Sequence, residues 1–362
     1  MSEYGTRLVG AGVDLARMAS AMPTLHSERR GFGRYWYPDG RVKDTVFQWD
    51  NVDQYRASPY FTAHETGEWV EIRPMQANES LYPIEEDLRQ EGITHYICVP
   101  IFLSQGMPAG MTYSTTNPEG FSAEAIRVLR TVEPGVAVIM DQRAKQLMLD
   151  DLLRIYVGRE PHDRILQGEV RRGDVMRMQS AILFADMTGF TRLTQSMTAE
   201  ETAALLNAYY DCVVPSVEFN DGEVLKYIGD GVLAVFRCDD EKSTAAAVEH
   251  ALQAASDIIE SVGTRETAGD TGLPPFDIRV GLHVGEVAYG NVGSGARLDF
   301  TVIGSAVNLA SRITDLAGTL NRQVILSSEF ADQVPASSET ESLGAFPLKG
   351  FDTPCPVYGL SD

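Results

Sequence analysis

The amino-acid sequence predicts a mixed α+β protein, an α/β sandwich with two folded domains joined by a helical connector. Its 362 residues exceed the roughly 250–300 residues at which one hydrophobic core stops growing. Strand-like runs recur in pairs around short turns, which is typical of antiparallel hairpins. Between these pairs, apolar residues recur at intervals of three and four, the spacing of helices that bury one face.

The N-terminal part of the chain contains two predicted hairpins. Residues 32–50 alternate aromatic and polar side chains around Pro38-Asp39-Gly40, where Pro and Gly supply the backbone angles of a turn. Residues 95–116 repeat this pattern, with extended runs on either side of a turn-like segment.

A helical pattern begins near Ser122, a residue type that suits an N-cap. Pro134-Gly135 is expected to interrupt the helix, after which helical spacing resumes with Leu149 and Leu152. Two interpretations stay open for this second stretch. It is a connector that packs against a second copy of the chain, or a helix that packs on its own domain.

The domain boundary is predicted in residues 154–174, which are rich in Arg, Gly, Asp and Glu and precede a strongly apolar segment. We therefore expect a first domain over residues 1–145, a helical connector or transducer over 146–175, and a second domain over 176–362.

The charge balance restricts the function. A formal net charge of -21 disfavours binding to nucleic acid or to an anionic bilayer as the main activity, because the average surface would repel both. A bound polyphosphate would need local neutralisation by metal ions and a few basic side chains. The sequence shows no N-terminal signal pattern and no run of about 18 apolar residues, so a cytoplasmic protein is expected.

Two acidic residues are candidates for metal binding. Residues 180–186 form a predicted buried strand that ends on Asp186 and is followed by Met187. Residues 222–236 form a predicted hairpin whose tip exposes Asp230. Each acidic residue alone also fits an ordinary turn or helix cap. Together, two carboxylates at strand ends suit hard Mg²⁺ ions and leave positions for phosphate.

The next segments add basic and amide side chains. Residues 276–285 form a predicted strand in which Arg279 is a candidate phosphate ligand, while His283 is expected to be a hydrogen-bonded core residue. The glycine-rich residues 290–295 do not open a helix in a βαβ unit, so we expect a loop and no dinucleotide site. The sequence also lacks a Walker A run, which argues against a P-loop triphosphatase.

Residues 298–312 predict a strand, a glycine turn and a helix in that order. Asn308 and Arg312 are four residues apart, so both side chains leave one face of the helix and can reach one ligand. A solvated face is the alternative. Apolar neighbours at Val307 and Leu309 favour partial burial, where a phosphate partner would stabilise the arginine.

The four motifs, taken in order, resemble the class III adenylate cyclase catalytic domain. They are Phe-x-Asp-Met-x-Gly-Phe-Thr, Lys-Tyr-Ile-Gly-Asp-Gly, Arg-Val-Gly-Leu-His-x-Gly and Phe-Thr-Val-Ile-Gly-x-x-Val-Asn-Leu-Ala-x-Arg. The resemblance covers residues 179–359 and implies a ferredoxin-like catalytic fold. Ser305 departs from the pattern, since many relatives carry an acidic residue there.

The resemblance also implies a role for each matching position. Asp186, Met187 and Asp230 would hold the metal, Lys226 and Thr301 would select the purine, Asn308 would orient the ribose, Arg312 would stabilise the α-phosphate, and Arg279 and Lys349 would contact the terminal phosphates. Lys with Thr favours adenine, because guanylate cyclases typically carry Glu and Cys at those positions.

The expected partners follow from the same resemblance. The substrate would be ATP, with two Mg²⁺ or Mn²⁺ ions in each active site, and each site would be completed across a homodimer interface. Neither nucleic acid nor a membrane is expected as a partner. Two alternatives stay open: a guanylate or dual-specificity cyclase, and a catalytically silent sensor or scaffold with a cyclase fold.

Residues 1–145 resemble a GAF-type sensor domain, most clearly over residues 92–141. The resemblance lies in the order of hairpins and helices, since the Asn-Lys-Phe-Asp-Glu signature of cyclic-nucleotide-binding GAF domains is missing. This half is therefore expected to sense an unknown small-molecule ligand and to regulate the other half through the connector.

Overall fold

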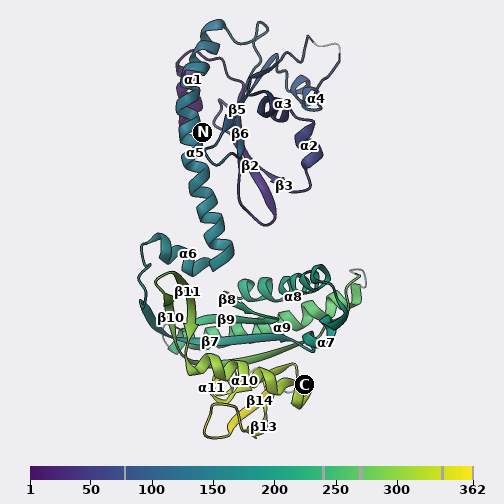
Figure 1. Cartoon of the computed structure of the whole chain (residues 1–362), viewed down its shortest axis with the longest axis vertical. Coiled ribbons are helices and arrows are strands. Elements are labelled where there is room, and N and C mark those ends of the chain that lie inside the picture. The colour runs from purple at the N-terminus through teal and green to yellow at the C-terminus, as the bar shows by residue number, and fades with distance from the viewer. Residues whose placement is uncertain (77–78, 239–240, 269–271, 336–337, 361–362) are drawn as a thin grey trace. The chain divides into compact units, whose positions relative to one another are not determined.

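The computed structural model describes residues 1–76, 79–238, 241–268, 272–335 and 338–360. The chain forms two compact units, Met1–Tyr156 and Val157–Asp362, each with its own sheet (Figure 1). The α+β prediction is confirmed. The predicted boundaries after residues 145 and 175 stay predictions.

The first unit is built on one antiparallel sheet with the strand order β3-β2-β1-β6-β5-β4. Its strands are β1 (Arg17–Pro23), β2 (Arg29–Trp36), β3 (Val42–Gln48), β4 (Val70–Ile72), β5 (His95–Phe102) and β6 (Pro108–Thr115). Its shorter helices are α1 (Ser2–Gly10), α2 (Val52–Arg56), α3 (Pro59–Thr66) and α4 (Ile84–Gln90). Both predicted hairpins are confirmed, as β2–β3 and β5–β6.

The predicted break at Pro134 is wrong. Helix α5 runs without interruption from Ala123 to Val157 and contains Pro134 in its interior. Proline removes one helical hydrogen bond and crowds the preceding turn, which disfavours a helix interior. Here Leu129, Met140 and Ala144 of the same helix are buried in the core of the first unit, and this packing on both sides of the proline offsets that cost.

The second unit contains a sheet with the order β13-β14-β12-β10-β7-β9-β8, to which β11 adds by pairing with β10. Its strands are β7 (Val175–Met187), β8 (Glu223–Ile228), β9 (Gly231–Cys238), β10 (Ile278–Ser294), β11 (Arg297–Ile303), β12 (Val324–Ser327), β13 (Thr340–Phe346) and β14 (Cys355–Leu360). Its helices are α6 (Arg159–Leu166), α7 (Phe190–Leu193), the 3₁₀ turn η1 (Thr194–Ser196), α8 (Ala199–Phe219), α9 (Glu241–Ala268), α10 (Ser305–Leu320) and α11 (Ser328–Ala331).

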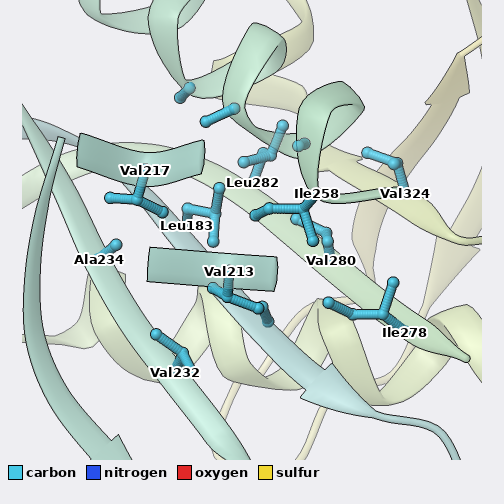
Figure 2. Close-up of a cluster of buried hydrophobic side chains, with 14 of the residues drawn as sticks. Leu183, Val213, Val217, Val232, Ala234, Ile258, Ile278, Val280, Leu282 and Val324 are labelled. Atoms are coloured by element: carbon cyan, nitrogen blue, oxygen red, sulfur yellow. The ribbon is translucent and has the colours of Figure 1, made fainter. Parts of the chain in front are cut away.

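One face of this sheet is covered by α8 and α9 (Figure 1). Figure 2 shows Leu183 and Val280 from the central strands packed with Val213 of α8 and Ile258 of α9. All four side chains are fully buried. Because side chains alternate along a strand, the neighbouring residues of β7 point to the other face.

The opposite face carries a second core. Ile182 and Phe184 of β7 pack there with Tyr289 of β10, Val302 of β11 and Ala310 of α10. The β10–β11 ribbon and α10 therefore cover the face that α8 and α9 leave free. Asp186 is in phase with Ile182 and Phe184, so its carboxylate emerges on this same face.

The loop predicted for residues 290–295 is wrong. β10 continues to Ser294 and pairs with β11 from Ala288 to Ser294. Its glycines permit close approach of other backbones: a Cβ on Gly290 would lie 2.1 Å from the carbonyl oxygen of Asp174, and one on Gly293 would lie 2.4 Å from that of Arg297. Residues 290–294 therefore serve strand packing, and of this run only Gly295 lies in the turn that leads to β11.

Two glycines of β10 make room for α10. A Cβ on Gly281 would lie 2.2 Å from Oγ1 of Thr314 and 2.7 Å from the carbonyl oxygen of Ala310. A Cβ on Gly285 would lie 2.6 Å from that of Ala306. The helix therefore lies directly on the strand, and these glycines set the position of every side chain that α10 presents.

We predict that Gly281→Ala destabilises the protein by about 1–3 kcal/mol, because the added methyl group overpacks the α10 contact. Gly263→Ala is the matched control, since Gly263 lies in α9, a Cβ there would meet open space, and its replacement favours the helix. Thermal unfolding should show a lower Tm for the first variant and an equal or higher Tm for the second. An unchanged Tm for Gly281→Ala would contradict the close packing.

Candidate active site

The two predicted metal-binding residues come together at the end of the sheet. Asp186 is the penultimate residue of β7, and Asp230 lies in the turn between β8 and β9. Gly229 gives this turn a left-handed backbone with φ 64°, and the Tyr210 hydroxyl donates to its carbonyl oxygen at 2.7 Å. The turn is thus held by α8, with Asp230 facing Asp186.

The Asp186 carboxyl has a raised pKa in this arrangement. Burial raises the pKa of Asp186 to about 7, and the charge of Asp230 together with a hydrogen bond between the two carboxyls contributes to the rise, while Arg279 opposes it. At neutral pH the pair therefore holds a proton for part of the time. A hard divalent cation would relieve the same repulsion, so the donor set fits such an ion.

Met187 can contribute to this site only through its main chain. Its side chain is buried in the core of the α8–α9 face. The predicted metal contact of Met187 is therefore left to its carbonyl oxygen. Two carboxylates and a carbonyl leave about half of the six positions of a Mg²⁺ ion open for water or phosphate.

Arg279 lies directly beside the carboxylates. It is the registered partner of Asp186 across the β7–β10 pairing. Its guanidinium lies against α10, where a Cβ on Gly318 would be 2.7 Å from its central carbon. The half-buried cation is thus positioned next to the acidic pair, where a polyphosphate bound to a metal would need it.

Lys226 forms an ion pair that the sequence did not predict. Its ammonium contacts the carboxylate of Asp299 on β11, with side chains 40% and 54% exposed. Asp299 and Thr301 are two residues apart on β11, so both leave the same face of that strand. The pair therefore brings Lys226 to the strand face that carries Thr301. The sequence does contain a signal for Asp299: it lies two residues before Thr301 in a predicted strand, so the two side chains are expected on one face.

Asn308 and Arg312 share one partly exposed face of α10, as the spacing predicts. Arg312 has a partner within the chain, since its Nη1 lies 3.3 Å from Oδ2 of Asp315. The sequence predicts a phosphate as the partner of this arginine. In the structure Asp315, one turn further along α10, supplies the opposite charge, and it also contributes to the raised pKa of Asp186.

Lys349 and His283 lie elsewhere. Lys349 is exposed in the loop between β13 and β14, and β14 is separated from β7 by β12 and β10 in the sheet order. The single chain therefore does not join Lys349 to the acidic pair. His283 is buried and its Nδ1 lies 2.8 Å from Oγ of Ser327, which confirms the expectation of a hydrogen-bonded core histidine.

The family model of the adenylate and guanylate cyclase catalytic domain matches residues 176–361. An adenylate cyclase of Anabaena cylindrica is 36% identical over 195 residues, which cover 52% of this chain and 38% of that protein. Adenylate cyclase 1 of Rhizobium meliloti (strain 1021) is 30% identical over 183 residues, covering 50% of this chain and 27% of that protein. The chain thus spans well under half the length of these relatives.

Two of the solved structures similar to this chain are adenylyl cyclases. The adenylyl cyclase CyaB from P. aeruginosa is 28% identical, with a TM-score of 0.45 and coverage of 52% of this chain and 96% of that one. A bacterial light-regulated adenylyl cyclase is 20% identical, with a TM-score of 0.54 and coverage of 76% and 88%. The second similarity supports the fold. In the described residues, no helix has the length and apolarity that a membrane span requires.

We predict that Asp230→Asn stabilises the metal-free protein at pH 8 and has little effect at pH 4. The folded-state pKa of Asp186 is about 7 against an ordinary 3.8, so the folded state binds the proton more tightly and loses stability as pH rises between these values. Removing the neighbouring charge should raise Tm at pH 8 by about 2–4 °C, equivalent to about 1 kcal/mol.

The control for this experiment is Asp352→Asn, which removes an exposed carboxylate from the loop before β14. Differential scanning calorimetry of both variants and the wild type at pH 4 and pH 8 makes the comparison. Equal Tm shifts in the two variants would show that repulsion between the carboxyls does not cause the stabilisation. A rise in Tm for Asp230→Asn that is the same at pH 4 and pH 8 would show the same.

Proposed function

Since the chain belongs to the family of adenylate and guanylate cyclase catalytic domains, we propose that it is an adenylate cyclase. The reaction converts ATP to 3′,5′-cyclic AMP and pyrophosphate. The ribose 3′-hydroxyl attacks the α-phosphorus in line, its proton is lost, and the bond from the α-phosphorus to the bridging oxygen breaks as pyrophosphate leaves.

The choice of ATP rests on the contact between Lys226 and Asp299. The carboxylate holds the ammonium at the strand face of Thr301, so a donor and a hydroxyl are available at one edge of a purine. An ammonium can donate to N1 of adenine, which is an acceptor, whereas N1 of guanine carries a hydrogen. The Thr301 hydroxyl can accept from the adenine amino group.

We infer that two Mg²⁺ or Mn²⁺ ions bind through Asp186, Asp230 and the carbonyl of Met187. When bound, such ions supply a lower pKa for the 3′-hydroxyl and a counter-charge for the triphosphate. The raised pKa of Asp186 supports this assignment, because a pair of carboxyls that resist joint ionisation gains most from a cation.

The remaining side chains orient the substrate and stabilise charge. Asn308 would hold the ribose so that the 3′-hydroxyl lines up with the α-phosphorus. Arg312 would exchange Asp315 for the α-phosphate as negative charge grows on its oxygens. Arg279, beside the acidic pair, and Lys349 would bind the terminal phosphates. Loss of a donor that stabilises charge of this kind costs about 10² to 10³ in rate.

The active site is proposed to form between two copies of the chain, with the metal-binding residues of one and the purine- and ribose-binding residues of the other. Apolar side chains are exposed on the elements that carry these residues: Tyr227 and Ile228 on β8 are 51% and 50% exposed, and Ile303 on β11 is 45% exposed. A second copy would bury them.

The first unit is proposed to be a GAF-like sensor that takes a small-molecule ligand. Its antiparallel sheet with helices on both sides supports a domain of this kind. Leu149 and Tyr156 near the end of α5 are 52% and 81% exposed, which supports a connector that pairs with its copy in a dimer.

We predict that the purified protein makes cyclic AMP from ATP with Mn²⁺ or Mg²⁺, and little cyclic GMP from GTP. Lys226→Ala should lower kcat/KM for ATP by about 10- to 100-fold, the value of one hydrogen bond to a charged group. Lys43→Ala, at an exposed site in β3 of the first unit, is the control. Chromatography of the products measures both nucleotides.

Equal rates with ATP and GTP would favour the dual-specificity alternative, and a larger rate with GTP a guanylate cyclase. A folded protein that binds ATP and yields neither product with either metal would be a catalytically silent scaffold.

We further predict complementation between two inactive variants. Asp186→Ala removes a metal ligand and Asn308→Ala removes a ribose contact, so each homodimer lacks one residue in both of its sites. In a mixed dimer both changes fall in one site and the other is intact. Free exchange of subunits at equal concentrations should restore about a quarter of wild-type activity.

Mass spectrometry of differently tagged subunits verifies that exchange has occurred. Mixed dimers without activity would contradict the shared site, and so would an active monomer.

A further inference from the structure

Helix α6 begins against the strand that carries Lys226. The turn at Gly158, with φ 92°, precedes α6 and lies against β8, since a Cβ on Gly158 would be 3.7 Å from the carbonyl oxygen of Val224. The backbone N–H of Glu160 donates to Oε1 of Glu223 at 2.9 Å. Glu223 therefore caps the N-terminal end of α6 from another element.

The side chain of Glu160 is bound by two arginines. Nη1 of Arg237, on β9, lies 3.0 Å from both of its carboxylate oxygens. Nε of Arg164, one turn along α6, lies 2.9 Å from Oε1. The Glu160 side chain is only 15% exposed. The Arg237 contact is charge-assisted and crosses from β9 to α6, so it ties the helix to the β8–β9 hairpin. The Arg164 contact lies within α6 and orients the Glu160 carboxylate for it.

The two glutamates also contact each other. Burial raises the pKa of Glu223 to about 7; the N–H of Glu160 and Arg237 oppose the rise, while the charge of Glu160 and the bond between the two carboxyls add to it. Other groups around the pair are Tyr289 of β10 and Glu169, which binds Arg164 at 3.0 Å. Glu223 is thus protonated part of the time and can donate to Glu160.

Glu223 is the first residue of β8, three residues before Lys226, on the hairpin whose turn holds Asp230. β8 pairs with β9 from Glu223 to Ile228, and the register shifts by one residue between Val224 and Lys226. A displacement of Glu223 therefore reaches Lys226 through this irregular step of the hairpin. A contact at the start of this strand therefore has a short covalent path to a purine-binding residue.

We propose that Glu160 and Glu223 form a latch through which α6 positions the β8–β9 hairpin, so that the segment entering the catalytic unit sets the placement of Lys226. This inference rests on the proposed function for its catalytic consequence. The latch itself is a structural contact and can be tested without turnover. Both glutamates are positioning residues, since neither has a substrate-facing role.

Two variants of the 362-residue chain, Glu223→Gln and Glu223→Ala, separate the hydrogen-bonding role of the Glu223 side chain from its charge. The amide of glutamine accepts from the Glu160 N–H and donates to the Glu160 carboxylate, so this variant keeps the latch at every pH. Alanine removes it. Arg237→Ala weakens the latch by removing the arginine that binds Glu160. Because the Arg237 side chain is exposed, this variant replaces Glu223→Ala if Glu223→Ala does not fold. Glu286→Ala, which breaks the exposed pair with Arg177, is the matched control.

Hydrogen exchange of residues 159–166 and 224–228 gives the first readout. We expect at least tenfold faster exchange at the Glu160 amide and faster exchange in β8 for Glu223→Ala, and wild-type exchange for Glu223→Gln and Glu286→Ala. Kinetics give the second readout. KM for ATP should rise about three- to tenfold in Glu223→Ala with a reduced preference for ATP over GTP, and Glu223→Gln should restore both.

Wild-type exchange in Glu223→Ala would overturn the latch. Faster exchange in α6 with unchanged exchange in β8 would overturn its role in positioning the hairpin, and so would unchanged KM and nucleotide preference. A wild-type protein that makes no cyclic nucleotide would overturn the proposed function instead, while the exchange of residues 159–166 and 224–228 would still decide the latch.

Discussion

The continuous pairing of β7 with β10 is the constraint on which the candidate site depends. The two strands are in register from Met187 with Ile278 to Val175 with Gly290. This pairing sets Arg279 beside Asp186, and it leaves the other edge of β10 to receive β11, with Thr301, further along. The same strand presents Gly281 to α10, whose packing there determines where Asn308 and Arg312 emerge. A shift of one residue would turn Asp186 to the wrong face of the sheet.

Opposite charges within the chain balance two of the candidate substrate-binding cations. Lys226 contacts Asp299, and Arg312 contacts Asp315. Both pairs are partly exposed, so each is weak enough for a nucleotide to displace the carboxylate. The acidic pair is less well balanced, because burial and the charge of Asp230 raise the pKa of Asp186 despite the opposing charge of Arg279. In a chain with a net charge of -21, the site thus combines two paired cations with one acidic centre that Arg279 neutralises only in part.

Sequence patterns failed where packing overrides local preference. Pro134 lies inside a helix because residues before and after it are buried in the core of the first unit. Gly290 and Gly293 lie in a strand because neighbouring backbones approach too closely for a side chain. In both cases the residue type allows two conformations, and contacts with residues far along the chain select between them.

Local periodicity and turn chemistry are enough to predict the mixed α+β class, the hairpin that carries Asp230, the strand that ends near Asp186 and the shared helical face of Asn308 and Arg312. The surroundings of these residues depend on contacts between elements that are distant in the sequence. Asp299 contacts Lys226 from β11, which is far along the chain. Helix α10 packs against two glycines of β10 for which the sequence predicts no role. Glu160 and Glu223 lie 63 residues apart and meet only where α6 abuts β8. Contacts of this kind come from sheet register and helix docking, which a residue's own neighbours in the sequence do not specify.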